Sequence, residues 1–457
     1  MSVDPALTGV LPAAVRCKVA WRVVPLIFVL YVIAYLDRAN LAFAKLGMQG
    51  DLDWLDSEVY GWGSGFFFFA GYLLLEIPGA LIVEHWSARK WFCRILLTWG
   101  VCSMAMAFVQ TPGQFYLARF LLGLAEAGFF PGVIVYLTHW FPRADRARAL
   151  SGLVFGVPFS LALGSQLSAF IMRYSWYDVA GWQWVFLIEG APAVLFGALV
   201  PFLMTDRPSQ ATWLSQTDRE CLEQTLQRER AEAAVAGNVT LVQALRQPSV
   251  WILSLGILAT NTGGYAMGFW MPTFIDNILK APLEPLVAAS ALASNASPPT
   301  GALSYLGLVY LCGLAGVLIS GQSSDRAGER KWHCIAGQVG TGVFLAISSL
   351  IPGQPFGLVM VWLCLMGFCA YFWPSPFWVL PTMSMSASAA AVSIGVINIC
   401  ANVAGLIGST TVGHLKASGW SDAMCMLFCS SCYVGGGVII AMLRVKPKSA
   451  SSERKAA

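Results

Sequence analysis

The sequence predicts an all-α membrane protein whose twelve transmembrane helices form two six-helix bundles. Hydrophobic residues make up 57% of the chain and charged residues only 11%, far below the roughly one quarter that soluble domains carry. Apolar runs of about 20 residues, long enough to cross ~30 Å of hydrocarbon, recur along the whole chain. One long charged interval, residues 205–249, divides these runs six and six.

Each expected helix is one of these apolar runs. In chain order the runs cover residues 22–44, 61–83, 91–109, 114–137, 149–172, 183–204, 250–274, 302–324, 333–351, 357–380, 389–412 and 422–443. We therefore expect four parts: an N-terminal six-helix bundle (1–204), a cytoplasmic linker (205–249), a C-terminal six-helix bundle (250–445) and a cytoplasmic tail (446–457).

The basic residues of the short loops predict the orientation, because Lys and Arg concentrate on the cytoplasmic side of a membrane. One set of connections holds three basic clusters: Arg89, Lys90 and Arg94; Arg143, Arg146 and Arg148; and Arg326, Arg330 and Lys331. The opposite set is poor in bases and includes an acidic stretch at 51–58. With an even number of spans, we expect both termini in the cytoplasm and a multi-pass protein of the inner (plasma) membrane.

Two loops carry a related signal at the same place in each half. GALIVEHWSARKW runs from Gly79 to Trp91, and GVLISGQSSDRAGERKW runs from Gly316 to Trp332. Each has an acid, Glu84 or Asp325, shortly before a basic cluster that ends in Lys-Trp. Internal repetition of this kind marks many secondary transporters. The alternative is that the preference for basic residues in cytoplasmic loops produced two similar loops independently.

Charges lie well inside the expected first and fourth spans, although a charge at mid-bilayer costs roughly 2.5–3.5 kcal/mol. Asp37 and Arg38 lie in the first span and Arg119 and Glu126 in the fourth. Arg119 and Glu126 share one helix face about 10 Å apart, whereas Asp37 points about 100° away from Arg38. Such charges either pair to hold helices together or line a polar cavity. In a cavity, two guanidiniums can hold a carboxylate and a carboxyl group can exchange a proton.

Other functional classes have little support in the sequence. No GxxxxGK[ST] phosphate loop is present, which disfavours an ATP-driven pump. The four histidines, His85, His139, His333 and His414, are dispersed, so we expect neither an enzyme nor a metal site. A sensor on the same fold, without transport, stays open. We expect a monomer in the lipid bilayer with no nucleic-acid partner and no cofactor other than a coupling proton.

At these residues the sequence resembles the major facilitator superfamily, and within it the anion:cation symporter family. The first-half motifs are YLDRANLAFAKL (35–46) and ARFLLGLAEAGFFPG (118–132), and GQSSDRAGERK follows the eighth span. NTGGYAMGFWMPTF (261–274) and INICANVAGLIGS (397–409) resemble the seventh and eleventh helices of the family. The resemblance covers essentially the whole chain. The branch of the family that the sequence resembles includes bacterial permeases for sugar acids, tartrate, phthalate and hydroxyphenylacetate.

The resemblance implies the major facilitator fold and proton-coupled uptake of a small organic anion by alternating access. By motif position, the expected site residues fall into four roles: substrate carboxylate on Arg38 and Arg119, protonation at Asp37 and Glu126, pocket lining by Tyr35 and Tyr72, and cytoplasmic gating by Glu84, Arg89, Asp325, Arg326 and Arg330. Two departures concern the first gating loop, where Glu84 replaces the usual Asp and Ser87 the usual Gly. A proton-independent facilitator or an anion exchanger is the alternative, since it needs both arginines but no titrating Glu126.

Polar residues of the second half are expected to complete the site. Asn261 and Tyr265 share one face of the seventh span, and Asn398 and Asn402 share one face of the eleventh. Asn side chains offer a donor and an acceptor, which suits hydroxyls or a second carboxylate. They also make ordinary hydrogen bonds between packed helices. Trp373 either flanks an aromatic substrate ring or packs in the core.

Overall fold

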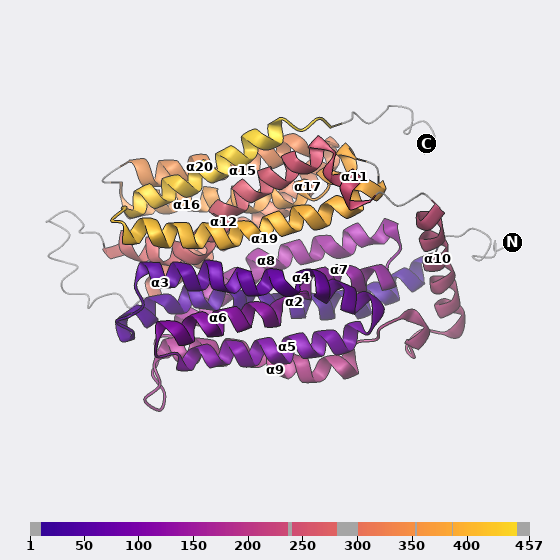
Figure 1. Ribbon diagram of the computed structural model, residues 1–457, viewed down its shortest axis with the longest axis horizontal. Coiled ribbons are helices and arrows are strands. Elements are labelled where there is room, and N and C mark those ends of the chain that lie inside the picture. The colour runs from indigo at the N-terminus through magenta and orange to yellow at the C-terminus, as the bar shows by residue number, and fades with distance from the viewer. Residues whose placement is uncertain (1–10, 236–239, 281–299, 352–353, 386, 446–457) are drawn as a thin grey trace.

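The computed structural model describes residues 11–235, 240–280, 300–351, 354–385 and 387–445 (Figure 1). The expected tail, 446–457, lies outside these residues. Within them the chain is helical almost throughout, and its strand-like pairing is limited to one isolated bridge between Trp176 and Val179.

The first part of the chain forms long helices with three short helical segments between them. They are α2 (Ala13–Asp51), α3 (Ser57–Gly61), the π-helical η1 (Trp62–Phe67), α4 (Phe68–His85), α5 (Ala88–Ala105), the 3₁₀ turn η2 (Met106–Phe108), α6 (Pro112–Glu126), α7 (Phe129–Trp140), α8 (Arg143–Ile171) and α9 (Gly181–Leu203).

The rest of the described chain also forms mostly long helices, which follow a polar stretch between the two halves. That stretch holds η3 (Pro208–Gln210), α10 (Gln216–Val235) and α11 (Leu241–Leu245). The following helices are α12 (Pro248–Lys280), α14 (Thr300–Ala327), α15 (Lys331–Leu350), α16 (Phe356–Phe372), α17 (Pro374–Phe377), α18 (Leu380–Ser384), α19 (Ala387–Ala417) and α20 (Asp422–Ala441).

Eleven stretches of the described residues are long and apolar enough to cross a membrane. The expected seventh span, α12, is 33 residues long but does not reach the same apolarity. Thr260, Asn261 and Thr262 stand in its middle, followed by two glycines. A helix that is polar at mid-span is expected where it borders a polar interior instead of lipid.

The long helices lie side by side in two groups, with α10 across one end (Figure 1). Helices α2 to α9 form the first half and α12 to α20 the second. We call the end that holds Ser57–Gly61 the α3 end and the opposite one the α10 end. Since α4 runs away from α3, its loop to α5 lies at the α10 end.

The hydrophobic run of the fourth span contains two helices, because the chain breaks between Glu126 and Phe129. Gly128 has a φ of +81°, a left-handed conformation that favours glycine. It also lies against α4, where an added Cβ would come within 2.8 Å of the Gly79 Cα. This break makes Glu126 the last residue of α6.

The two halves meet closely at the α3 end. The Tyr60 hydroxyl donates to the Phe269 carbonyl (2.9 Å), and Ser64 and Ser409 share a hydrogen bond of 2.6 Å. Gly61 and Gly413 face each other so tightly that a Cβ on Gly61 would lie 2.8 Å from the Gly413 Cα. Contact at this distance brings α3 and α19 together with no side chain between them.

Candidate functional site

The centre of the site is an ion pair between the first and fourth spans. Arg38 Nη2, on α2, donates to Glu126 Oε1 at the end of α6. Only 3% of Glu126 is exposed, whereas the Arg38 side chain is 16% exposed, so the acid is the more deeply buried member of the pair. Glu126 thus has its ion-pair partner on another helix and not in Arg119, with which it was expected to share a face. The helix rise explains the difference, because Arg119 lies about 10 Å from Glu126 along the axis, whereas the Arg38 guanidinium reaches Glu126 from α2.

Arg119 is buried beside this pair without an acid of its own. Its Nε donates to the Gly63 carbonyl in η1 (3.3 Å), and its guanidinium carbon lies 4.5 Å from the Phe68 ring centroid. Its Nη1 and Nη2 have no hydrogen-bond partner among the described residues, and neither has Arg38 Nε. Buried donors without partners are unusual in folded proteins. Here they mark a place where an anion would complete the hydrogen bonding.

Aromatic rings surround the Arg38 guanidinium. Its central carbon lies 5.6 Å from the Tyr35 ring centroid, 5.8 Å from that of Phe68 and 5.3 Å from that of Tyr72. Phe68 therefore contacts both arginines of the site. These distances are within the range of cation–π attraction, which holds the guanidinium in place while leaving N–H groups available.

Asp37 lies in a separate cluster, on the side of α2 that faces α5. Its carboxylate accepts hydrogen bonds from Trp99 Nε1, the Ser103 hydroxyl and Asn40 Nδ2, the last at 2.6 Å. Only 1% of Asp37 is exposed. The structure thus brings Arg38 and Glu126 together and places Asp37 on a different face, as the helical spacing predicts.

In the second half, Asn398 and Asn402 of α19 converge on an acid that the sequence analysis did not single out. Both Nδ2 groups donate to Glu76 Oε1 on α4, that of Asn402 at 2.8 Å. Glu76 is 4% exposed, and its Oε2 has no partner among the described residues. An acid inside the apolar run 61–83 was the available signal, by the same argument that selected Asp37.

Two more charges inside spans were also missed. Lys45 is fully buried, with Nζ 4.1 Å from the Tyr60 ring centroid and 3.5 Å from that of Trp270 in the other half. Glu189, on α9, accepts a hydrogen bond from Ser168. Glu189 lies inside the expected span 183–204, so the rule for charges within spans would have selected it. Lys45 was missed because the expected first span ends at residue 44, whereas α2 continues to Asp51.

The other expected second-half residues lie in different surroundings. Tyr265 packs against Phe69 of the first half, with ring centroids 4.7 Å apart. Asn261, on the same helix, is half-buried. Trp373 is buried in an apolar cluster with Phe377 and Ile397 within the second half.

The expected gating residues make their described ion pairs within their own half. Arg330, just before α15, pairs with Asp325 in the last turn of α14. In the first half, Asp206 accepts hydrogen bonds from the Arg89 backbone N–H and the Ser87 hydroxyl, both at 2.8 Å. Glu84 is exposed, and its backbone carbonyl accepts from Arg207 (3.5 Å). Arg326 is exposed near the end of α14. Asp206 is thus the acid of the first loop, and sequence reasoning missed it because it lies at the start of the linker.

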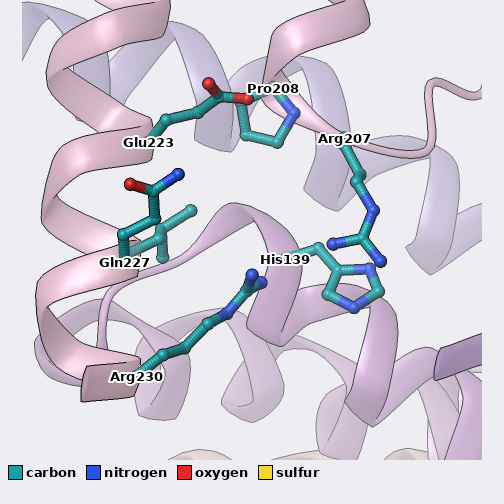
Figure 2. A pocket seen from close by; sticks show the side chains of 7 residues that line it. His139, Arg207, Pro208, Glu223, Gln227 and Arg230 are labelled. Atoms are coloured by element: carbon teal, nitrogen blue, oxygen red, sulfur yellow. The ribbon is translucent and has the colours of Figure 1, made fainter. Parts of the chain in front are cut away.

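A separate pocket lies where α10 meets the end of α7 (Figure 2). Its lining includes the basic side chains of His139, Arg207 and Arg230 and the acid Glu223. Figure 2 shows these side chains pointing into the space between α10 and the neighbouring segments. None of the expected site residues lines this pocket, so it is distinct from the site around Arg38.

Known proteins share this sequence pattern and fold. The sequence profile of the Major Facilitator Superfamily matches residues 27–409. An Agrobacterium vitis relative named "Putative tartrate transporter" is 38% identical over 90% of this chain and 87% of its own. "Putative metabolite transport protein NicT" of Pseudomonas putida is 34% identical over 92% of this chain and 93% of its own. A solved bacterial homolog of the human lysosomal transporter Spinster, inward-facing and unoccupied, superimposes with a TM-score of 0.67 at 16% identity, covering 94% of this chain and 95% of that one.

The structural likeness confirms the predicted fold class. At 16% identity it speaks for the fold alone. The two relatives, in contrast, match over nearly the whole of both chains, and both are named as transport proteins.

Proposed function

This chain belongs to the Major Facilitator Superfamily, whose members are membrane transporters and not enzymes, and on that premise we propose that it imports a small organic anion with protons by alternating access. A relative named for tartrate supports an organic acid as substrate. The proposal places the protein in the inner membrane with both termini in the cytoplasm, in agreement with the distribution of basic loops.

The observation that carries the proposal is the set of unpaired guanidinium nitrogens. Arg38 Nε and Arg119 Nη1 and Nη2 are buried, and none has a hydrogen-bond partner among the described residues. Leaving a buried donor unpaired costs about 1–3 kcal/mol, and more for a charged group. A carboxylate presents two oxygens that accept such N–H groups in a fork, so an organic anion would remove this cost.

Proton coupling follows from the partner of Arg38. In the structure, Arg38 neutralises Glu126. A substrate carboxylate that binds Arg38 competes with Glu126 for the guanidinium, and the buried carboxylate is then better accommodated with a proton than without. Proton and anion therefore load together. By linkage, protonation of Glu126 must tighten anion binding by the same free energy.

The test compares wild type with Glu126→Gln in proteoliposomes. The substrate is first found by thermal-shift screening of carboxylates, since a ligand that binds the native state stabilises it. We expect wild type to accumulate that carboxylate when a proton gradient is imposed. Glu126→Gln resembles the protonated side chain, so it should bind and exchange the substrate but lose the accumulation.

Two outcomes and one further variant separate the alternatives. Accumulation by Glu126→Gln would contradict the coupling role of this residue. A parallel Asp37→Asn variant measures how far Asp37 shares it. Wild-type transport that ignores the proton gradient would favour the facilitator or exchanger, which uses the arginines alone.

A further inference from the structure

We propose that Glu76 is a built-in competitor of the substrate: its carboxylate occupies the Asn398 and Asn402 amides in the empty carrier, and the arriving anion displaces it. The inference rests on the proposed function, because it assumes that an organic anion binds near Arg38. It adds a residue of the first half that tunes affinity through two donors of the second.

The first argument is the incomplete bonding of Glu76. Asn398 and Asn402 both donate to Oε1, while Oε2 has no partner among the described residues. Glu126 has an arginine within ion-pair distance, but no cation of the described chain lies within 4.0 Å of Glu76. A buried carboxylate that is hydrogen-bonded only by neutral amides, with its nearest cation beyond ion-pair distance, is less well compensated than one in an ion pair. Its bonds to the two amides are therefore easier to exchange than an ion pair.

The second argument is position. Glu76 follows Tyr72 by four residues on α4, so the two side chains share a helix face about one turn apart. The Tyr72 ring lies 5.3 Å from the Arg38 guanidinium carbon. An anion held at Arg38 would extend along this face toward the two amides. Its hydroxyl or second carboxylate group would meet donors that Glu76 already occupies.

The third argument concerns the two halves. Glu76 lies on α4, and both asparagines lie on α19, so these hydrogen bonds join one half to the other. Two packed helices that close without substrate need some acceptor for the buried amides. Glu76 supplies it in the empty carrier. Displacement by substrate would replace one cross-half connection with another.

The experiment is a double-mutant cycle on binding, with Glu76→Ala and Asn402→Ala made singly and together. Tartrate is the first probe, replaced by the best carboxylate of the thermal screen if tartrate does not bind. Without the competitor, Glu76→Ala should bind the probe roughly threefold to tenfold more tightly than wild type. Asn402→Ala should weaken binding more in the Glu76→Ala background than in wild type, because the amide is then free for the probe.

Transport provides an independent readout. The empty Glu76→Ala carrier lacks its acceptor between the halves, so net uptake should slow relative to exchange. Glu76→Gln keeps a carbonyl acceptor and loses the charge, so its affinity should fall between wild type and Glu76→Ala. This isosteric variant also tests the idea if Glu76→Ala does not fold.

Weaker binding in both Glu76 variants would overturn the proposal, because Glu76 would then contact the substrate as a partner. Equal effects of Asn402→Ala in both backgrounds would overturn it as well. If binding requires Arg38 but ignores Glu76, this inference alone fails. If Arg38→Lys leaves binding unchanged, the proposed function fails.

Discussion

At the scale of single residues, burial gives each charged side chain only the partners that neighbouring helices supply. Arg38 has an acid, Arg119 has a backbone carbonyl, and Asp37 has three neutral donors. The sequence predicted that these charges lie inside spans and that Asp37 faces away from Arg38. It could not predict that Glu126 pairs with Arg38, because that depends on where α6 ends and which helices pack together.

The difference between arginine and lysine tests the anion site directly. Lysine keeps the charge but has no planar fork, so Arg38→Lys and Arg119→Lys each lose charge-assisted hydrogen bonds to a carboxylate. Losing about 1.5–3 kcal/mol of such bonding corresponds to roughly 10- to 100-fold weaker binding. Calorimetric titration of the purified variants with the screened carboxylate measures this, and Arg246→Lys in the linker region is the matched control. Wild-type affinity in both site variants would exclude the arginines as substrate ligands.

At the scale of helices, hydrophobicity and length were sufficient to predict the class of fold. Features set by backbone geometry were not visible in that pattern. Span four, expected at 114–137, contains a break at Gly128, and hydropathy does not report a positive φ. Span two begins with the π-helical segment 62–67, whose Gly63 carbonyl accepts from Arg119. Both irregularities lie beside the candidate site. The break follows Glu126, and the π-helical segment supplies the carbonyl that accepts a hydrogen bond from Arg119.

Replacing Gly128 tests whether the break in span four positions Glu126. Gly128→Ala adds a Cβ at a φ of +81° and within 2.8 Å of the Gly79 Cα, so it combines strain with a clash. We expect a loss of about 1–3 kcal/mol in stability, seen as a lower thermal unfolding temperature in detergent, and weaker proton-driven accumulation. Gly113→Ala is the control, since it lies on α6 with nothing within 4 Å of an added Cβ. Equal behaviour of the two variants would show that the break does not matter.

At the scale of the whole molecule, several hydrogen bonds between the halves lie toward the α3 end, beyond those that Glu76 accepts midway along α4. They include Tyr60 with Phe269 and Ser64 with Ser409, and Lys45 lies between the rings of Tyr60 and Trp270. The described ion pairs of the gating loops, at the opposite end, stay within one half. With the α10 end in the cytoplasm, as we propose, this arrangement is that of a carrier closed to the outside. Neutralising Asp325 should therefore change the stability of the outward-facing state, which is closed at the α10 end, and not the stability of the state described here.

Closure at the α3 end depends on the contact between Gly61 and Gly413, which leaves no space for a side chain. A Cβ on Gly413 would lie 2.7 Å from the Gly61 Cα, so Gly413→Leu should force α3 and α19 apart and shift the population toward the state open at this end. Hydrogen–deuterium exchange measured by mass spectrometry should rise in the peptide 57–67 and fall in the loop 84–89. Gly395→Leu is the control on the same helix, because nothing lies within 4 Å of its added Cβ. If exchange at 57–67 stays at the wild-type level in Gly413→Leu, the glycine contact does not hold the halves closed, and the cage of Lys45 by Tyr60 and Trp270 is the next contact to change.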